Sequence, residues 1–478
     1  MNGRHRTLPN LRYSFGALAL FLALSVFITR PTLWQMGSAV PGWIFADNAQ
    51  YLWVLKWFEK ALVEPGLSPL FSSDVYYPYG FKLVYGEIMP AQSLPALATT
   101  LLFDEVVSYN ALVRFSYVFT GLNTYLLVFY LTGNRWAGLL SGIIFAFCPF
   151  RFVKTATLPA MGTQWMPLTF LYIERTLRDA RPKNAALAGL FFSLTALSSW
   201  NYAAAFLLLV PLYVMVRAWP WSRTLANKRL LWAALVSITV ITVLVVPPMF
   251  PYLGLGDSGD SVHSLLEADK WSVSPMDYLI PNPLHPLWLR WAVRHLLPTN
   301  DLIVAFEFVQ SLGLVSLLLA FYGLKKNRDR VSRALLRTAL GAVLFSMGVT
   351  LHLHGRPVRL PVPVEVAERF NAMMNYVTQN LSRLHVPYDL AVGGAVAIPL
   401  PMLLLFLFVP PFGSMRSWNF IGAVAIFAVA VLAGLGLAKW LAEVRTRWKQ
   451  RGGDPAEIRF RFDAGARYAL SAGFFCLL

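Results

Sequence analysis

The chain has 478 residues, of which 57% are hydrophobic and only 14% are charged, and its mean hydropathy is +0.54. This composition excludes a soluble globular domain and indicates a polytopic membrane protein. The net charge of +17 would point to nucleic acid in a soluble protein, but here the basic residues gather in short loops between hydrophobic segments, so no nucleic-acid partner is expected.

The first apolar run, Phe15 to Ile28, follows Arg4, Arg6 and Arg12, an order that signal peptides and first transmembrane helices share. No clean small-residue cleavage site follows it, and many further hydrophobic segments do. We therefore expect an uncleaved first helix with its N-terminus in the cytoplasm.

A helix needs about 20 apolar residues to cross a bilayer. Candidate spans lie at 13–31, 108–132, 136–151, 161–178, 184–200, 202–218, 230–250, 302–323, 335–353, 419–441 and 466–478. The sequence thus predicts an all-α, polytopic transmembrane helical bundle of about eleven spans. The predicted transmembrane domain covers 1–465, and 466–478 is expected to begin a further helix, truncated because it stops short of the length of a span.

Three short loops carry clusters of basic residues and are expected in the cytoplasm. The clusters are Arg175, Arg178, Arg181 and Lys183; Arg217, Arg223, Lys228 and Arg229; and Lys325, Lys326, Arg328, Arg330 and Arg333. The long loops 32–107, 251–301 and 354–418 then fall outside, and function is expected there.

Some apolar stretches of these outer loops are predicted to lie along the membrane interface. Leu94 to Phe103 is too short to span. The segment 391–412 is apolar enough to cross, but crossing would place the basic residues that follow it outside, so a re-entrant or interface-lying helix is expected.

Asp47 is the first candidate for chemistry, since it places a carboxylate among aromatic residues about twenty positions after the first span. A solvated loop acid and a catalytic base facing a lipid-borne substrate are both consistent with this position. Tyr77 lies in the Pro- and Gly-containing turn Asp74 to Gly80, which is either structural or a surface for stacking on a sugar or a headgroup.

His285 and Glu307 belong to the second outer loop and the span after it. His285 lies between prolines, where a fixed imidazole can bind a phosphate or hydroxyl or can simply pack. Glu307 is an acid among apolar residues near the membrane face, where ionisation is costly without a partner. It is therefore a second catalytic candidate.

Arg416 lies at the outer end of the span that begins near 419. Its guanidinium suits a lipid phosphate, although snorkelling to the interface explains the position equally well. Arg151 and Lys154, placed just outside the third span, are candidates for the same anionic site.

No metal or cofactor is predicted. The sequence contains no Walker-type loop, dinucleotide fingerprint or zincin helix. His352 and His354 are expected at the end of a helical span, where residues two positions apart point in different directions, so they are not expected to share a metal ion.

These features together resemble the GT-C superfamily of polytopic glycosyltransferases, which includes protein O-mannosyltransferases, aminoarabinose transferases and oligosaccharyltransferases. Asp47 matches the family's first-loop Asp, and Arg416 resembles a ligand for the donor phosphate. The runs Ser198 to Tyr202, Pro281 to Trp288 and Leu351 to Gly355 look like those of a group of uncharacterised bacterial membrane proteins assigned to this superfamily. Many members carry paired acids in the first loop, whereas Asn48 follows Asp47 here, so the resemblance does not extend to a two-acid or metal-assisted mechanism in that loop.

The resemblance implies an enzyme of the plasma (inner) membrane that transfers a hexose or pentose from a polyprenyl-phosphate carrier to a glycan, lipid or protein acceptor at the outer face. Asp47 would deprotonate the acceptor, and a single displacement would invert the anomeric centre. Two other functions stay open: a transporter or flippase for a lipid-linked sugar, and a non-catalytic protein of envelope assembly. A transporter is expected to bury ionisable residues near the bilayer midplane, where these spans have almost none.

Overall fold

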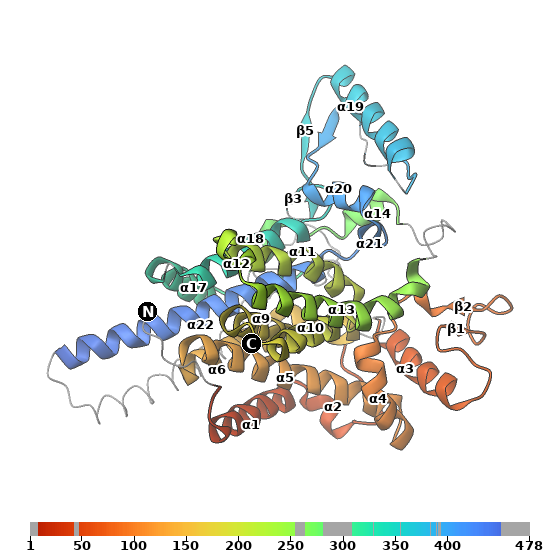
Figure 1. Ribbon diagram of the computed structural model, residues 1–478. Helices are drawn as coiled ribbons and strands as arrows, with labels where there is room; N and C mark the ends of the chain where they lie inside the picture. Colours follow the sequence, from red (N-terminus) through yellow and green to blue (C-terminus); the bar gives the residue numbers. More distant parts are fainter. Residues whose placement is uncertain are drawn as a thin grey trace.

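The computed structural model describes residues 8–42, 47–253, 263–280 and 308–450, apart from 328, 354, 383, 389 and 391–392. Helices dominate this part of the chain, and the longest of them run roughly along one axis (Figure 1). Its named strands form two-stranded antiparallel pairs, β1 with β2, β3 with β4 and β5 with β6. The predicted all-α transmembrane bundle is confirmed.

The bundle consists of α1 (Leu11–Ile28), α5 (Glu105–Thr132), α6 (Arg135–Ala146), α9 (Met166–Asp179), α10 (Pro182–Ala196), α11 (Trp200–Arg217), α13 (Lys228–Leu253), α17 (Leu314–Lys326), α18 (Arg330–Ser346) and α22 (Asn419–Gln450). The first loop contains α2 (Arg30–Trp34), α3 (Asn48–Val63), β1 (Phe71–Ser72), β2 (Phe81–Lys82), η1 (Leu83–Tyr85) and α4 (Pro90–Leu102). Short elements between bundle helices are α7 (Pro149–Val153), η2 (Lys154–Ala156), α8 (Leu158–Met161), α12 (Trp221–Leu225), α14 (Leu265–Lys270) and η4 (Pro275–Tyr278). The last loop contains β3 (His352–Leu353), β4 (Arg356–Pro357), β5 (Arg359–Pro361), α19 (Val364–Tyr376), η5 (Val377–Leu381), β6 (Ala395–Ala397), α20 (Pro401–Phe408) and α21 (Pro410–Gly413).

Within the described residues, five helices are long and apolar enough to cross a membrane, and a sixth span forms if α6 and the α7–η2 segment, bent by 42°, count as one. The predicted span 466–478 and the first part of 302–323 lie outside the described residues. Helices stand at the other predicted spans that the structure describes, but α9, α10, α17 and α18 have only 13 to 17 residues. In the described part of the predicted span 302–323, residues 308–313 are not helical, and α17 begins at Leu314 after Gly313, whose φ is positive (73°).

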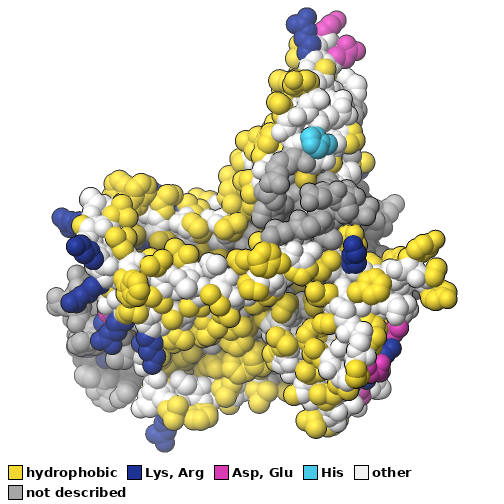
Figure 2. Space-filling model, turned by 45° about the vertical axis from the view of Figure 1, so that its right-hand side comes forward, with side chains coloured by type: hydrophobic (Ala, Val, Ile, Leu, Met, Phe, Trp, Pro, Cys, Tyr) yellow, Lys and Arg dark blue, Asp and Glu magenta, His cyan; other side chains and the backbone are white. Residues whose placement is uncertain are grey.

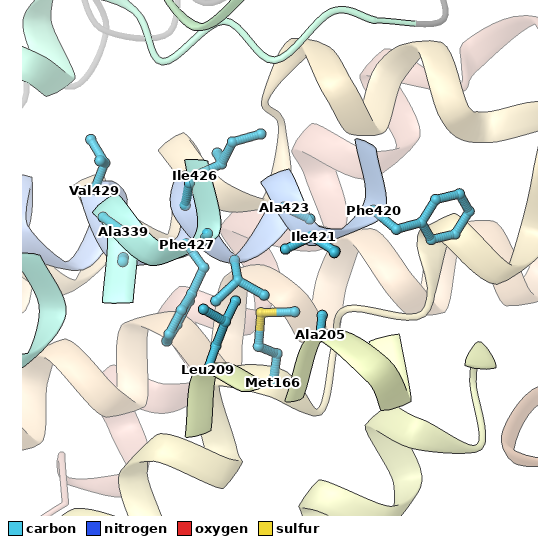
Figure 3. Packing of buried hydrophobic residues seen from close by; sticks show 14 of the residues in the cluster. Met166, Ala205, Leu209, Ala339, Phe420, Ile421, Ala423, Ile426, Phe427 and Val429 are labelled. Atoms are coloured by element: carbon cyan, nitrogen blue, oxygen red, sulfur yellow. The ribbon is translucent and has the colours of Figure 1, made fainter. Parts of the chain in front are cut away.

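Helix α22 forms the centre of the bundle. Its apolar stretch from Phe420 to Leu437 is buried by α6, α11, α17 and α18. Figure 3 shows Ile421 and Phe427 of α22 lying near Leu209 of α11 and Met166 of α9. A helix that is apolar on all sides can lie in the core of a membrane bundle or against lipid, and the burial of α22 by its neighbours places it in the core.

The two ends of the bundle differ in charge. The helix ends that carry the predicted cytoplasmic clusters come together at one end, which we call the basic end, because the short connections make successive helices antiparallel (Figures 1 and 2). The first loop, α14 and the Met415–Trp418 turn lie at the opposite end, which we call the loop end.

A buried ion pair joins α9 and α11 at the basic end. Glu174, whose side chain is 2% exposed, accepts hydrogen bonds from Arg217 Nε (2.7 Å) and Nη2 (3.0 Å) and from the Tyr213 hydroxyl (2.8 Å). We expect Glu174→Ala to lower the free energy of unfolding by about 3–5 kcal/mol, because it leaves the largely buried Arg217 guanidinium, 22% exposed, and the buried Tyr213 hydroxyl without their partner. Thermal unfolding in detergent measures this. Glu443→Ala is the matched control: it removes a half-buried acid at the same end, whose partners are the Tyr322 hydroxyl and the partly exposed Lys326. It is expected to change the melting temperature much less, and an equal loss in both variants would contradict the prediction.

Two local predictions are wrong. The segment 391–412 is not one helix, because prolines restrict α20 to Pro401–Phe408 and Ala395–Ala397 pairs with β5 as a strand. His352 lies in β3 rather than at the end of a span, since α18 ends at Ser346, while His354 lies outside the described residues. The buried His352 ring places Nε2 3.5 Å from Asp269 Oδ2.

Candidate active site at the loop end

Asp47 directly precedes α3 and presents an exposed carboxylate. The side chain makes no capping bond to its own helix; instead, Oδ2 accepts a hydrogen bond from the Thr157 hydroxyl at 3.2 Å. Gly42 lies close to η2, since a Cβ on this residue (φ 124°) would stand 2.5 Å from that of Ala156. The first loop and the α7–α8 segment thus meet at this acid.

Tyr51, one helical turn into α3, connects Asp47 with residues from distant parts of the chain. Its side chain is 6% exposed. Burial raises the pKa of Tyr51 well above the ordinary value for tyrosine, the negative charges of Glu87 and Asp47 raise it further, and Arg416 lowers it. The hydroxyl therefore lies within electrostatic reach of two acids and one guanidinium, from the first loop and from the last.

Arg416 forms an ion pair with an acid of α14. Its Nη1 donates to Glu267 Oε1 at 2.6 Å, and the His263 ring contacts the other carboxylate oxygen at 3.0 Å. Partial burial alone would raise the pKa of Glu267, but hydrogen bonds from Arg416 and His263 outweigh it and lower that pKa. The Arg416 side chain remains 51% exposed, so part of the guanidinium faces solvent.

The turn that carries Arg416 is also hydrogen-bonded to α14. The buried Trp418 donates from Nε1 to the carbonyl of Ala268 at 2.7 Å. Asp269, the next residue, accepts from the Thr350 hydroxyl and lies beside the His352 ring. Buried contacts thereby fix the backbone next to Arg416, while the Arg416 side chain itself is half-exposed to solvent.

Glu87 is a second acid of the first loop near this site, and the sequence analysis did not identify it. Its Oε1 accepts hydrogen bonds from the Ser199 hydroxyl (2.7 Å) and Asn201 Nδ2 (2.8 Å) at the N-terminus of α11, where the helix dipole favours a negative charge. The signal was available: an isolated acid in an apolar stretch of the first loop, and the run Ser198 to Tyr202, which the resemblance singled out. What the sequence could not supply was their contact.

Burial raises the pKa of Glu87 to about 7 despite these hydrogen bonds. A folded-state pKa above the ordinary 4.5 means that Glu87 contributes stability below pH 4.5, and that this contribution is lost as the pH rises through about 7. We therefore expect the stability of wild type relative to Glu87→Gln to decline across this interval and to stay level above it. Chemical unfolding of both proteins at several pH values measures this, and parallel pH profiles would contradict it.

Arg151 and Lys154 lie under the site rather than on its surface. Arg151 is fully buried and donates to the hydroxyls of Thr120, Ser116 and Thr163 and to the carbonyls of Ala146 and Met161. Lys154 is 4% exposed and begins η2. Arg151 thus supports the α7–α8 segment that reaches Asp47. The chain bends between α6 and α7, and this bend points Arg151 into the protein, whereas the sequence analysis placed it outside the third span.

Tyr77 stands apart from the acids, on a projecting turn where its ring is 88% exposed. Its neighbour Tyr76 stacks on Phe81 at 5.3 Å and lines a cavity of about 280 Å³ together with Gln50, Trp53 and Glu87. The cavity therefore joins the aromatic turn to the acid that α11 holds.

His285 and Glu307, the other two predicted site residues, lie outside the described residues. Within the described part of the chain, no three His, Cys, Asp or Glu side chains group as metal ligands would. Asp47 is hydrogen-bonded to Thr157 of the segment after Lys154, and Arg416 lies at the same end of the bundle. Tyr77 stands on a projecting turn of the first loop, and Arg151 supports the α7–α8 segment from inside.

No protein-family model and no curated protein matches the chain, whereas several solved structures do. The chain is similar to the archaeal oligosaccharyltransferase AglB from Archaeoglobus fulgidus, in complex with an inhibitory peptide and a dolichol-phosphate. The identity is 14% and the TM-score 0.47, over 97% of this chain and 55% of AglB. The chain thus spans about half the length of that enzyme.

It is also similar to ArnT from Cupriavidus metallidurans bound to undecaprenyl phosphate, with 15% identity and a TM-score of 0.45, over 89% of this chain and 78% of ArnT. The apo state of the same ArnT gives 14% identity and a TM-score of 0.43.

Proposed function

We propose that the protein is an inverting glycosyltransferase that moves a sugar from a polyprenyl-phosphate carrier to an acceptor at the outer face of a bacterial plasma membrane, with its N-terminus in the cytoplasm. One arrangement carries the proposal: the exposed Asp47 carboxylate and the half-exposed Arg416 guanidinium both lie at the end of the bundle opposite the basic loops, and the charges of both influence the pKa of Tyr51. A base and a phosphate ligand are the two groups that this reaction needs.

Asp47 has the exposure and the position of a general base. Its Oδ2 is oriented by the Thr157 hydroxyl, and the exposed carboxylate has room for an acceptor hydroxyl. As that oxygen attacks the anomeric carbon from the side opposite the phosphate, Asp47 takes its proton, the bond between carbon and phosphate oxygen breaks, and the configuration inverts.

Arg416 is assigned to the carrier phosphate. In the absence of donor its exposed ion pair with Glu267 contributes little to stability, so exchange for a phosphate is not costly. The phosphate offers oxygens in the geometry that a guanidinium binds through two N–H groups, and the same contact stabilises the charge that develops on the leaving group. A phosphate leaving group needs no general acid.

The cavity beside Glu87 is assigned to sugar recognition. Trp53 and Tyr76 supply aromatic surface, while Gln50 and Glu87 supply polar groups for hydroxyls. A glycan, a lipid or a protein would serve as acceptor. No metal ion takes part in this proposal.

The test uses purified protein in nanodiscs with a panel of polyprenyl-phosphate hexoses and pentoses, radiolabelled in the sugar, with nucleotide sugars as the carrier-free control. Release or transfer of label from a lipid-linked sugar alone is the expected result. Movement of intact lipid-linked sugar across sealed vesicles without cleavage would replace the proposal by a flippase. Neither cleavage, transport nor binding with any donor would favour a structural protein of envelope assembly.

A further inference from the structure

A group of exposed tyrosines stands on the turn that joins β1 to β2. Tyr76, Tyr77 and Tyr79 are 73%, 88% and 87% exposed, and we call residues 76–80, which carry them, the tyrosine turn. Aromatic surface left open to water costs free energy, and a cluster of it marks a place where a partner binds. The turn therefore presents a surface for a partner.

The tyrosine turn is held in one shape by its backbone and by its neighbours. The amide groups of Tyr79 and Gly80 donate to the carbonyl of Tyr76 at 2.9 Å and 3.2 Å. The ring of Tyr76 stacks on that of Phe81, with centroids 5.3 Å apart, and a Cβ on Gly80 (φ 73°) would collide with the Phe71 ring. Because the backbone is ordered before any ligand arrives, little conformational entropy is lost on binding.

The tyrosine turn extends away from the membrane. In Figure 1 the β1–β2 hairpin lies at the loop end, farther from the basic end than α4. The residues at the end of α4, Leu101, Leu102 and Phe103, are all exposed, as expected of a helix that lies along the membrane interface. Spanning helices lie roughly along the membrane normal, so a hairpin beyond the level of α4 reaches into water. The aromatic belt of the interface does not explain these tyrosines.

The exposed chemistry of the tyrosine turn is aromatic, hydroxylated and uncharged. Residues 76–80 include no acid and no base, so the turn offers no charge to a phosphate or to a charged protein surface. A tyrosine has a flat apolar face and one hydroxyl. A sugar ring has the matching groups, with C–H bonds on its faces and hydroxyls around its edge. The partner that fits this chemistry is therefore a carbohydrate.

The tyrosine turn is also continuous with the cavity assigned to sugar recognition. Tyr76 and Phe81 line that cavity together with Glu87. Tyr77 and Tyr79 follow Tyr76 on the same turn and are more exposed. A sugar chain that has one unit at the mouth of the cavity can thus place a further unit on these two rings.

We propose that the tyrosine turn binds the acceptor, and that the acceptor is a glycan of several sugar units. Tyr77 and Tyr79 stack on a unit away from the reacting hydroxyl, while the end of the chain enters the site. The word acceptor rests on the proposed function, whereas binding of a glycan to the turn stands without any transfer. A single sugar cannot use both the cavity and the turn, so affinity depends on the length of the glycan.

The experiment measures saturation transfer by NMR from aromatic protons of the full chain in nanodiscs to free ligands, without donor. The probes are short unbranched oligosaccharides of hexoses and of N-acetylhexosamines, their monosaccharides, and a peptide rich in serine and threonine. Empty nanodiscs give the background. The variants are Tyr77→Ala, Tyr79→Ala and the two combined. Tyr376→Ala is the matched control, since it removes an exposed tyrosine of α19. Melting temperatures equal to that of wild type show that the variants fold.

Oligosaccharides are expected to receive several-fold more saturation than monosaccharides, mainly on the C–H protons of one ring face. Each single variant is expected to lower this transfer and the combined variant to lower it several-fold, while Tyr376→Ala leaves it unchanged. No transfer above empty nanodiscs to any oligosaccharide, or equal transfer in wild type and the combined variant, would overturn the proposal. Transfer to the peptide and to no sugar would replace the glycan by a protein. Glycan binding in a protein that cleaves no donor would contradict the proposed function and leave the glycan site standing.

Discussion

Asp47→Asn is expected to lower the turnover of a lipid-linked sugar by about 10²–10⁴-fold while leaving donor affinity nearly unchanged, because a general base contributes about that much to the rate. Asparagine keeps the size of the side chain and an oxygen that can accept from the Thr157 hydroxyl, so the loop should keep its structure. Single-turnover kinetics with donor saturating, beside a direct measurement of donor binding, separate the two effects.

Asp74→Asn is the matched control for this variant. Asp74 is an exposed acid of the same loop whose Oδ2 pairs with Lys60 at 2.9 Å, away from the acids around Tyr51. Its turnover is expected to equal that of wild type. Full activity of Asp47→Asn would remove Asp47 from the chemical step. Glu87 would then be the alternative base, and activity would rise with pH through about 7 in wild type but not in Glu87→Gln.

The sequence predicted the parts of this site whose signals are local. Asp47 could be recognised because it follows the first apolar span closely. Arg416 could be recognised because it lies near Trp418, just before the last described span. That the charges of both influence the pKa of Tyr51 is not visible in the sequence, because this depends on how the first and last outer loops are placed in the fold. Glu87 was missed for the same reason, since its partners Ser199 and Asn201 follow it by 112 and 114 residues.

The predicted bundle was correct in class and too regular in detail. Apolar runs mark where a helix is buried in lipid or protein, but they do not mark where it ends. In one predicted span α17 begins only after Gly313, and prolines reduce 391–412 to the short helix α20. The 42° bend between α6 and the α7–η2 segment similarly turned Arg151 from an expected surface ligand into a buried brace. In each case a few backbone torsions decide the outcome, and hydropathy does not record them.

Arg416→Ala is expected to raise the KM for a polyprenyl-phosphate sugar by roughly ten- to a hundredfold, since a hydrogen bond to a charged group contributes about 1.5–3 kcal/mol. The effect on kcat at saturating donor is expected to be smaller, because most of the lost contact binds the ground state and the transition state alike. Initial rates over a range of donor concentrations give both constants.

Glu267→Gln tests the same assignment in the opposite direction. In the free protein Glu267 occupies the guanidinium at 2.6 Å, so a donor phosphate must displace a carboxylate whose lowered pKa keeps it ionised at neutral pH. Neutral glutamine competes less well, and KM is therefore expected to fall or stay level, while Arg416→Ala raises it. If Glu267 serves only to hold Arg416 in place, both variants will raise KM together, and a carrier phosphate exchanging with Glu267 is then excluded. Opposite changes in KM, by contrast, require an anion that competes with Glu267 for Arg416, which is the role that the transferase reaction assigns to the carrier.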